Sequence, residues 1–400
     1  MALRTRLTRL ALLALALALA ACDQRFVLVH ARDGAVADAP ASSMAYDLSC
    51  GVDHTCMLLS GALWCTGHDA TGQLGLPDGV DRLVPTRADV GDEWVAVSSG
   101  YGATCLLGTR GGLSCFGDNS ARQLATGDTA TRWAPTPISL PRPVVQFAFR
   151  FAHGCAVLDD ASLWCWGSNA EGELGQGDGG GSAPGAPVRV GPSLTWAEAS
   201  CGQGHTCAIT TDGALYCWGR NGGAQGLGAG MLAETSTPMR VGSATWRHVA
   251  AGQNHTCAIA ADGTLWCWGW DTRVDGHAGP VGLPTDVDVY EPMLVDAHTD
   301  WSVLSTDTFH TCGVRAGELW CRGRNIEGQL GTGDVEVVQT PTRIGTEADW
   351  ARVSAGRFFT CAQKQDGTVW CTGDDDFGET GIGPLERRTT FSRVAPPVTP

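Results

Sequence analysis

Seven cysteine pairs, recurring about every fifty residues, constrain this chain more than any other feature of its sequence. Their first members lie 49, 50, 52, 50, 55 and 49 residues apart along the chain. Each pair sits in two short apolar runs joined by a tight turn, as in residues 202–219. A period of this length is typical of proteins built from stacked copies of one small unit. The pairs are Cys56/Cys65, Cys105/Cys115, Cys155/Cys165, Cys207/Cys217, Cys257/Cys267, Cys312/Cys321 and Cys361/Cys371.

The spacing within each pair predicts a stapled β-hairpin. Five pairs are ten residues apart, and the other two, Cys56/Cys65 and Cys312/Cys321, are nine apart. In these two the turn is shorter by one residue, Ser60-Gly61 or Ala316-Gly317, as a two-residue hairpin requires. The cysteines therefore face one another in every repeat, close enough for a disulfide. Closing so small a loop contributes about 2.5 kcal/mol on the chain-entropy model.

Each repeat also contains two further extended segments. A tryptophan stands eleven residues before the first cysteine in five repeats, and Ala45 and Val144 replace it in the other two. A Gly-rich turn such as Gly172-Glu173-Leu174-Gly175 follows the hairpin, and an extended segment such as residues 238–241 comes next. Four short strands per fifty residues are typical of a propeller blade. We predict an all-β, seven-bladed propeller with four-stranded antiparallel blades and one hairpin disulfide in each.

This reading divides the chain into three parts. Residues 1–21 are a signal peptide, residues 22–44 a tether rich in Ala, Asp, Ser and Pro, and residues 45–397 the propeller. Within the tether, residues 26–29 could form a strand that pairs with the last blade. The expected repeats are 45–92, 93–142, 143–194, 195–244, 245–299, 300–348 and 349–397, and are called repeats 1 to 7.

The N-terminus predicts export and a lipid anchor. Three arginines precede a Leu/Ala run over residues 10–20, which is too short to span a bilayer. The run ends in Leu19-Ala20-Ala21-Cys22, which resembles a bacterial lipobox, so we expect Cys22 to be lipidated. An ordinary signal peptide is the alternative. Export to the bacterial cell envelope, whether periplasm-facing or cell-surface, agrees with the many cysteines, because disulfides persist in oxidising compartments.

Charge and composition restrict the partners. The formal net charge is −15, which is unfavourable for binding nucleic acid or an anionic membrane surface. We expect no cofactor, a monomeric domain, and contact with the membrane through the lipid anchor alone. Five histidines stand two residues before a first cysteine, which makes a Cys/Cys/His metal cluster conceivable, but buried structural histidines are the simpler reading. These are His54, His153, His205, His255 and His310.

The repeat unit resembles a known family. His205-Thr206-Cys207-Ala208-Ile209, then residues 212–221 and a Gly-Gln-Leu-Gly turn, are similar to the regulator-of-chromosome-condensation repeat. The resemblance covers residues 46–396 and implies seven blades and a protein-binding platform. Paired hairpin cysteines are typical of its secreted bacterial members. One bacterial group of the family inhibits β-lactamases and the eukaryotic namesake exchanges nucleotide on a small GTPase, but their contact loops are not recognisable here.

Departures from the repeat pattern direct the search for a site. Arg150 and Gly154 in repeat 3 replace glycine and threonine, and Ala103 and Phe359 replace the histidine of repeats 2 and 7. Repeat 5 loses its Gly-rich turn and carries an insertion, and inserted loops often bind partners. The candidate partner-binding residues in this insertion are Trp270, Asp271, Arg273, Asp275, His277 and Tyr290.

These observations favour a non-catalytic, membrane-anchored scaffold that binds another protein or an envelope polymer. The alternative is an extracytoplasmic carbohydrate-active hydrolase or lyase, for which Asp374-Asp375-Asp376 could supply paired carboxylates. Calcium binding by the acidic loops is a lesser alternative. We predict that Cys50 and Cys201 are unpaired thiols, because their repeats would lie nearly opposite each other in the ring.

Overall fold

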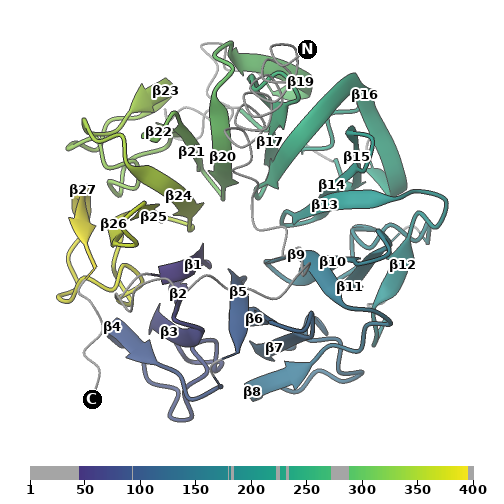
Figure 1. Cartoon of the computed structure of the whole chain (residues 1–400), viewed down its shortest axis with the longest axis horizontal. Helices are drawn as coiled ribbons and strands as arrows, with labels where there is room; N and C mark the ends of the chain where they lie inside the picture. Colours follow the sequence, from purple (N-terminus) through teal and green to yellow (C-terminus); the bar gives the residue numbers. More distant parts are fainter. Residues whose placement is uncertain are drawn as a thin grey trace, which may run out of the picture.

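The computed structural model describes residues 45–394, apart from residues 92, 179, 182–183, 222–225, 231–233 and 272–287. Its strands form antiparallel sheets arranged around a common centre, as Figure 1 shows. The first strand of each repeat lies innermost, and these strands contact one another in the order β1, β5, β9, β13, β16, β20, β24 and β1 again. The predicted strand at residues 26–29 lies outside the described residues.

Five repeats fold as separate four-stranded blades, with strands in sequence order from the centre outward. They are β1 (Ala45–Cys50), β2 (His54–Leu59), β3 (Ala62–Gly67) and β4 (Arg82–Arg87); β5 (Trp94–Ser99), β6 (Ala103–Gly108), β7 (Leu113–Gly117) and β8 (Arg132–Pro137); β9 (Val144–Arg150), β10 (His153–Leu158), β11 (Leu163–Gly167) and β12 (Val188–Val190); β20 (Trp301–Thr306), β21 (His310–Arg315), β22 (Glu318–Gly323) and β23 (Val338–Arg343); β24 (Trp350–Ala355), β25 (Phe359–Lys364), β26 (Val369–Gly373) and β27 (Arg388–Arg393).

The prediction of seven four-stranded blades is wrong, because the described residues form five such blades. Repeats 4 and 5 instead share one seven-stranded sheet. The long strand β16 passes without a break from the outer edge of repeat 4 to the inner edge of repeat 5, and Thr245 in the connecting segment pairs with Ala214, so the ladder continues through the link. This sheet contains β13 (Trp196–Cys201), β14 (His205–Thr210), β15 (Ala214–Arg220), β16 (Glu234–Ala251), β17 (His255–Ala260), β18 (Leu265–Gly269) and β19 (Val289–Asp296).

The hydrophobic core lies between consecutive repeats. Buried apolar side chains form clusters that each combine residues of two neighbouring repeats, for example Ile209 and Leu215 of repeat 4 with Ala258 and Trp268 of repeat 5. The second strand of each repeat is covered on both faces, and every residue of β14 is buried. Burial of apolar surface contributes about 25 cal/mol per Å², and here it stabilises the contacts between neighbouring repeats. The described repeats do not share one common core.

The glycine two residues after each second cysteine is required by the backbone. In repeat 4 this is Gly219, whose φ is 102° and whose added Cβ would lie 2.4 Å from the carbonyl oxygen of Gly204. All seven copies have φ between 98° and 117°. Only glycine tolerates this positive φ together with so close a backbone approach.

The ring closes with the same contacts that join its other repeats. The Ser354 hydroxyl accepts a hydrogen bond from the Cys50 backbone nitrogen at 2.9 Å, as the Ser49 hydroxyl does from Ser99 at 2.8 Å. An ion pair between Arg352 and Asp47 adds a charged contact at the junction of repeats 7 and 1. The four described strands of the last blade come from residues 350–393.

Candidate functional site

The middle of every hairpin is a disulfide staple. The cysteines of each pair face one another across the second and third strands of their repeat, with Cα atoms 4.1–4.2 Å apart. The disulfides join Cys56–Cys65, Cys105–Cys115, Cys155–Cys165, Cys207–Cys217, Cys257–Cys267, Cys312–Cys321 and Cys361–Cys371. Cys50 and Cys201 are free and buried. Burial raises the pKa of the Cys50 thiol to about 11 and that of Cys201 further, so neither is a ready nucleophile.

The histidines next to these cysteines connect neighbouring repeats. His205 Nε2 lies 2.9 Å from Thr256 Oγ1 of repeat 5, and that hydroxyl donates to the carbonyl oxygen of Gly226 at 2.7 Å. Because the hydroxyl donates to the carbonyl, the proton between the two side chains belongs to Nε2. The other four histidines make the same contact at 2.7–3.1 Å: His54 with Thr104, His153 with Thr206, His255 with Thr311 and His310 with Thr360.

Burial keeps these histidines neutral. It lowers the pKa of His54 and His205 to about 3 and that of His153 and His310 to about 4, since the charged form has no water around it. Throughout the described residues, no group of three or more His, Cys, Asp or Glu side chains is placed to hold a metal ion. Their contacts with threonines of the next repeat give the five histidines a part in joining the repeats.

Two departures from this network are neighbours in the ring. Repeat 2 has Ala103 in place of the histidine, and repeat 3 has Gly154 in place of the threonine that this histidine would contact. An added Cβ at Gly154 would lie 2.6 Å from the Trp166 ring. The loss of the histidine and the loss of its threonine thus occur at one junction, where Phe149 and Trp166 pack instead.

A second pair of departures meets near the centre of the ring. Arg150 and Asp307 occupy one repeat position, five residues before the first cysteine, where the other five repeats have glycine. Their side chains form an ion pair between repeats 3 and 6, and Arg150 Nη2 also donates to the Ala355 carbonyl at 2.7 Å. Asp307 is 1% exposed and Arg150 19%, so the pair is largely removed from water. The sequence singled out Arg150 but missed its partner.

One end of the strands gathers two sets of loops. The loop between the first and second strands lies beside the turn that follows the third strand, because the backbone nitrogen of Arg324 donates to Phe309 O at 3.0 Å and that of Asp374 donates to Phe358 O at 3.0 Å. The same bond recurs in the other repeats. We call this end the loop face.

Repeats 6 and 7 place an aromatic pair on the loop face. Phe309 and Phe358 are stacked with ring centroids 5.7 Å apart and an interplanar angle of 9°. The Arg324 guanidinium lies 4.7 Å from the Phe309 centroid, and that of Arg357 lies 4.8 Å from the Phe358 centroid. Both phenylalanines are half-buried and Arg357 is exposed. At the same repeat position the other repeats have Asp, Gly, Ala, Gly and Asn.

We call Phe309, Phe358, Arg324 and Arg357 the Phe–Arg cluster. Arg324 also forms an ion pair with Glu327 at 2.9 Å, whereas Arg357 has no ion pair with another described residue. Aromatic and arginine side chains that are partly open to water are enriched at the energetic centres of protein interfaces. The residues of the cluster stand at positions where the repeats differ in sequence. That difference could have pointed to them, but the two phenylalanines were not identified from the sequence.

Acidic side chains hold the turn of repeat 7 through hydrogen bonds to its backbone. Asp375 accepts a hydrogen bond from Thr380 N at 2.9 Å, and Glu379 accepts one from Phe377 N at 2.9 Å. In repeat 6 the side-chain oxygens of Asn325 and Gln329 accept the equivalent backbone hydrogen bonds. Burial raises the pKa of Asp375 to about 6 and that of Glu379 to about 8. These shifts follow from replacing amides with buried acids, so they give no support to the enzyme alternative.

The insertion of repeat 5 is described only at its ends. Asp271 is 2% exposed and donates from its backbone nitrogen to Asp288 Oδ1 at 3.0 Å. Trp270 and Tyr290 are half-buried, and the Tyr290 carbonyl accepts a bond from Gly230. Arg273, Asp275 and His277 lie outside the described residues, as does Cys22. Partner binding by this loop and lipidation of Cys22 stay predictions.

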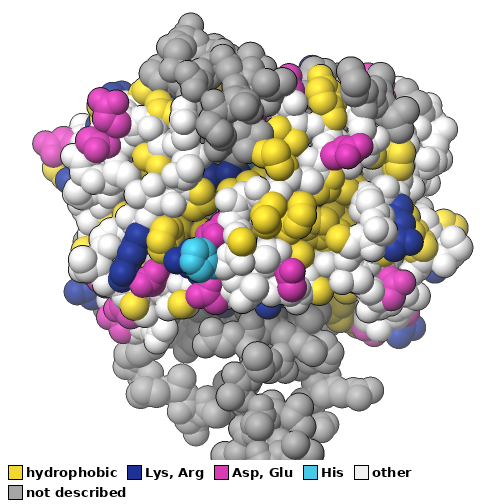
Figure 2. Space-filling view, turned by 90° about the horizontal axis from the view of Figure 1, so that it is seen from above, with side chains coloured by type: hydrophobic (Ala, Val, Ile, Leu, Met, Phe, Trp, Pro, Cys, Tyr) yellow, Lys and Arg dark blue, Asp and Glu magenta, His cyan; other side chains and the backbone are white. Residues whose placement is uncertain are grey.

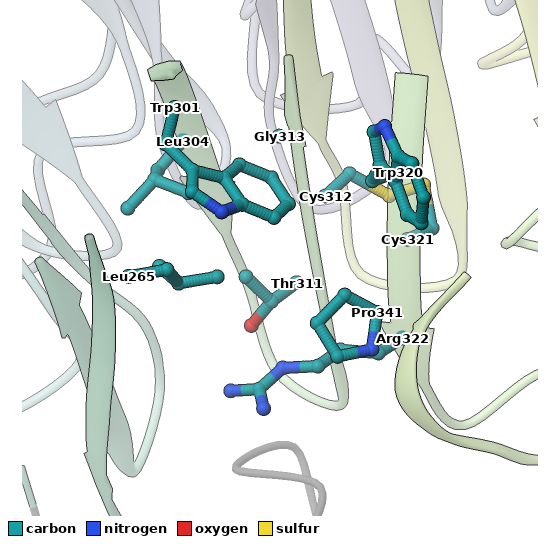
Figure 3. A pocket seen from close by; sticks show the side chains of 10 residues that line it. All are labelled: Leu265, Trp301, Leu304, Thr311, Cys312, Gly313, Trp320, Cys321, Arg322 and Pro341. Atoms are coloured by element: carbon teal, nitrogen blue, oxygen red, sulfur yellow. A yellow bond between two sulfur atoms is a disulfide. The ribbon is translucent and has the colours of Figure 1, made fainter. Parts of the chain in front are cut away.

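A small cavity lies between repeats 5 and 6 (Figure 3). Trp301, Trp320 and Leu265 surround it, and the guanidinium of Arg322 lies below Thr311. Arg322 is 1% exposed, and burial lowers its pKa to about 10. The cavity volume is about 10 Å³, which is the space of roughly one water molecule. It is too small for a ligand.

The outer surface does not single out a site by composition. On the edge of the ring seen in Figure 2, apolar, acidic and basic side chains are interspersed. The exposed large apolar residues of the described chain come from several repeats: Val80, Leu83, Val84, Tyr101, Trp133, Leu294, Val335, Phe377 and Leu385. Among the described residues, no helix has the length and hydropathy to cross a bilayer.

The fold and its loops define a β-propeller repeat protein whose variable residues lie at the ends of its strands. The chain belongs to the regulator of chromosome condensation (RCC1) repeat family. Two models of this repeat match it, one over residues 60–107, 160–209, 212–259 and 316–363 and the other over residues 144–173, 197–225, 246–273 and 350–379. Together these matches span more than half of the chain, which confirms the resemblance seen in the sequence.

Known relatives match parts of the chain. The ultraviolet-B receptor UVR8 of Arabidopsis thaliana is 27% identical over 201 residues, which cover 49% of this chain and 45% of that protein. Protein RCC2 of Homo sapiens is 41% identical over 69 residues, covering 17% of this chain and 13% of that protein. The chain thus spans less than half the length of these relatives.

Solved structures share the fold over most of the chain. Prp20p of Saccharomyces cerevisiae, described with its binding to Gsp1p and histones, aligns with a TM-score of 0.74 and 20% identity over 88% of each chain. The same yeast protein with Kap60 aligns with a TM-score of 0.73 and 20% identity over 93% of this chain and 91% of that one. Human WBSCR16 aligns with a TM-score of 0.69 and 20% identity over 79% of this chain and 85% of that one. At this identity the likeness concerns the fold alone.

Proposed function

We propose that this protein is a non-catalytic scaffold that binds a partner protein through the Phe–Arg cluster on its loop face. The observation that carries the proposal is the stacked Phe309–Phe358 pair flanked by Arg324 and Arg357. The two phenylalanines occupy a position that is small or polar in every other repeat, so the repeat fold itself does not need them.

The physical chemistry of the cluster suits a protein partner. Covering the half-buried rings removes apolar surface from water, and the two guanidinium groups hold the rings in place before the partner arrives. Arg357 keeps N–H donors available for a carboxylate or carbonyl group of the partner. Related propellers are consistent with this role, since the yeast protein of the same fold is described in complexes with Kap60 and in binding to Gsp1p and histones.

We further propose that the scaffold is held at the bacterial cell envelope by a lipid on Cys22. The lipobox-like segment at residues 19–22 supports this location. Replacing the cysteine, C22S, should move the full chain from the membrane fraction to the soluble fraction and remove the lipid mass from its N-terminal peptide. A variant that stays in the membrane fraction would contradict the anchor without affecting the binding proposal.

A crosslinking pull-down from the native envelope tests the binding proposal. The full chain should capture a defined protein, and the double variant Phe309→Ala, Phe358→Ala should lose it by about tenfold or more. Tyr101→Ala is the matched control, because Tyr101 is 56% exposed on the same kind of loop in repeat 2. Equal loss in both variants, or capture that survives the double substitution, would reject the cluster as the binding site.

The same experiment separates the alternatives. Capture that depends on residues 272–287 and not on the Phe–Arg cluster would place the partner on the insertion of repeat 5. Saturable binding to a purified envelope glycan would indicate a polymer ligand. Turnover of a glycan panel that is lost in Asp374→Asn would favour the enzyme.

A further inference from the structure

The tryptophan that begins the inner strand is open to water in repeat 2. Trp196, Trp246, Trp301 and Trp350 occupy the same repeat position and are 1%, 4%, 1% and 4% exposed. Trp94, by contrast, is half-buried. Because an indole ring is a large apolar surface, a partly uncovered one needs an explanation.

Repeat 2 lacks two kinds of residue that cover this tryptophan elsewhere: an aromatic residue and, in repeats 6 and 7, a long basic side chain. One is the residue just before the second cysteine: Tyr216 lies edge-on to Trp196 at 5.6 Å, and Trp266 to Trp246 at 6.2 Å. The corresponding residue in repeat 2 is Ser114, whereas it is Trp or Tyr in the other six repeats.

The second covering residue is the one paired with the inner tryptophan. In repeat 7 this is Lys364, whose Nζ lies 5.0 Å from the Trp350 centroid and 5.4 Å from that of Trp370. At this position repeats 4 and 5 have only Thr210 and Ala260. In repeat 2 it is Gly108, which has no side chain to offer. Both departures therefore remove cover from the same ring.

The result is a hollow of about 490 Å³ beside Trp94, within the size range of small-ligand pockets. Its walls include Trp94, Gly108, Leu113, Ser114 and Pro137, and two charged residues of opposite sign, Arg110 and Glu93, also line it. In repeat 6, Trp320 stands in the place of Ser114, and Trp301 is only 1% exposed. The indole nitrogen of Trp94 already donates to Val90 O at 3.2 Å, so the ring offers its face and not its N–H group.

We propose that this hollow is a binding site for an aromatic side chain of a partner protein that has a carboxylate beside it. The missing group is an aromatic ring in six of seven repeats, and the walls are mainly apolar, which favours a ring over a sugar. Arg110 on the rim is exposed and forms no ion pair with another described residue, so it can bind the neighbouring carboxylate.

The site is independent of the Phe–Arg cluster. It lies in another repeat and beside the hairpin turn of residues 108–112, which is at the other end of the second and third strands from the loop face. It would remain if the proposed function on the loop face failed. A chain with both sites could hold two partners, or two parts of one partner.

Titration of the purified full chain with N-acetyltryptophan, followed by ligand-observed NMR and calorimetry, tests the proposal. We expect saturable binding to one site and at least about tenfold weaker binding in Ser114→Trp, which supplies the missing ring from the chain itself. Gly108→Lys, which introduces the repeat 7 side chain, should weaken binding as well. Arg110→Gln should weaken binding of N-acetyltryptophan but not of its amide.

A second variant tests the reverse change, in which a repeat that covers its tryptophan loses the covering ring. Trp266→Ser should uncover Trp246 and raise the number of bound probe molecules from one to two, provided that its circular dichroism matches that of the parent chain. Undiminished binding in both Ser114→Trp and Gly108→Lys would overturn the proposal. So would the absence of saturable binding to the parent chain up to the solubility of the probe.

Discussion

The hairpin middles and the strand ends of this protein follow opposite rules. In the middles, the disulfide, the histidine-to-threonine contact and the glycine after the second cysteine recur with nearly constant geometry. At the ends, one repeat position holds Phe309 and Phe358 in two repeats and Asp, Gly, Ala, Gly or Asn in the others. The recurring residues join each repeat to the next, so the residues free to serve a partner are those that do not recur.

Departures within the network sharpen this contrast because most of them are matched by a second one. Ala103 is matched by Gly154, and Arg150 by Asp307. In the first pair a packed contact replaces the missing hydrogen bond, and in the second pair two opposite charges neutralise each other. The departures around Trp94 have no such match, and they leave a hollow. An unmatched departure is therefore a better sign of a binding site than a departure alone.

The largest effect should come from a hairpin glycine. Gly219→Ala would place a Cβ 2.4 Å from the Gly204 carbonyl oxygen at a φ of 102°, so we expect the free energy of unfolding to fall by about 4 kcal/mol. Chemical denaturation measures this change. Gly112→Ala is the control, because no atom lies within 4 Å of its added Cβ. An equal loss of stability for both substitutions would show that the hairpin glycine has no special backbone role.

The histidine-to-threonine contact should matter next. Thr256→Val removes the hydroxyl between His205 and Gly226 and leaves the buried His205 Nε2 without an acceptor. We expect a loss of about 2 kcal/mol in the free energy of unfolding. The exposed Thr390→Val on β27 should change it by less than about 0.5 kcal/mol. A small loss for Thr256→Val would mean that water replaces the hydroxyl.

The histidines should also make stability depend on pH. The folded pKa of His205 is lowered to about 3, while the unfolded chain titrates near 6.5, so the unfolded state binds more protons between these values. Stability from this residue is fully present above pH 6.5 and is lost as the pH falls toward 3. Going from pH 7.5 to 5.5 should cost about 1.4 kcal/mol for this one residue.

His205→Phe isolates that contribution, because repeat 7 accommodates Phe359 at the same position with no exposure. The variant should lose about 1.4 kcal/mol less than the parent chain between pH 7.5 and 5.5, as measured by denaturant midpoints. Buried acids such as Glu379 act in the opposite direction, but they are present in both proteins and cancel. Parallel pH profiles would show that the pKa of His205 in the folded state is close to its value in the unfolded chain.

The repeat fold could be predicted from sequence because its determinants are local. Cysteine spacing and turn length alone give the hairpin register. A glycine at the position of Gly219 in every repeat indicates a backbone conformation with positive φ. The shared sheet of repeats 4 and 5 could not be foreseen, since Thr245 joins the ladder only through the approach of β16 to Ala214. The Arg150–Asp307 pair and the Phe309–Phe358 stack join residues of different repeats, which a single repeat does not specify.

The smallest effect on stability should come from the loop face. Phe309→Ala with Phe358→Ala removes a stacked pair that is half-buried, so we expect a loss of only about 1 kcal/mol in the free energy of unfolding. Partner capture by the same variant should fall by about tenfold or more. The hairpin substitutions should show the reverse order, with a large loss of stability and unchanged capture per folded molecule. A loss of stability for the phenylalanine pair as large as that for Gly219→Ala would mean that the pair belongs to the recurring framework and has no separate binding role.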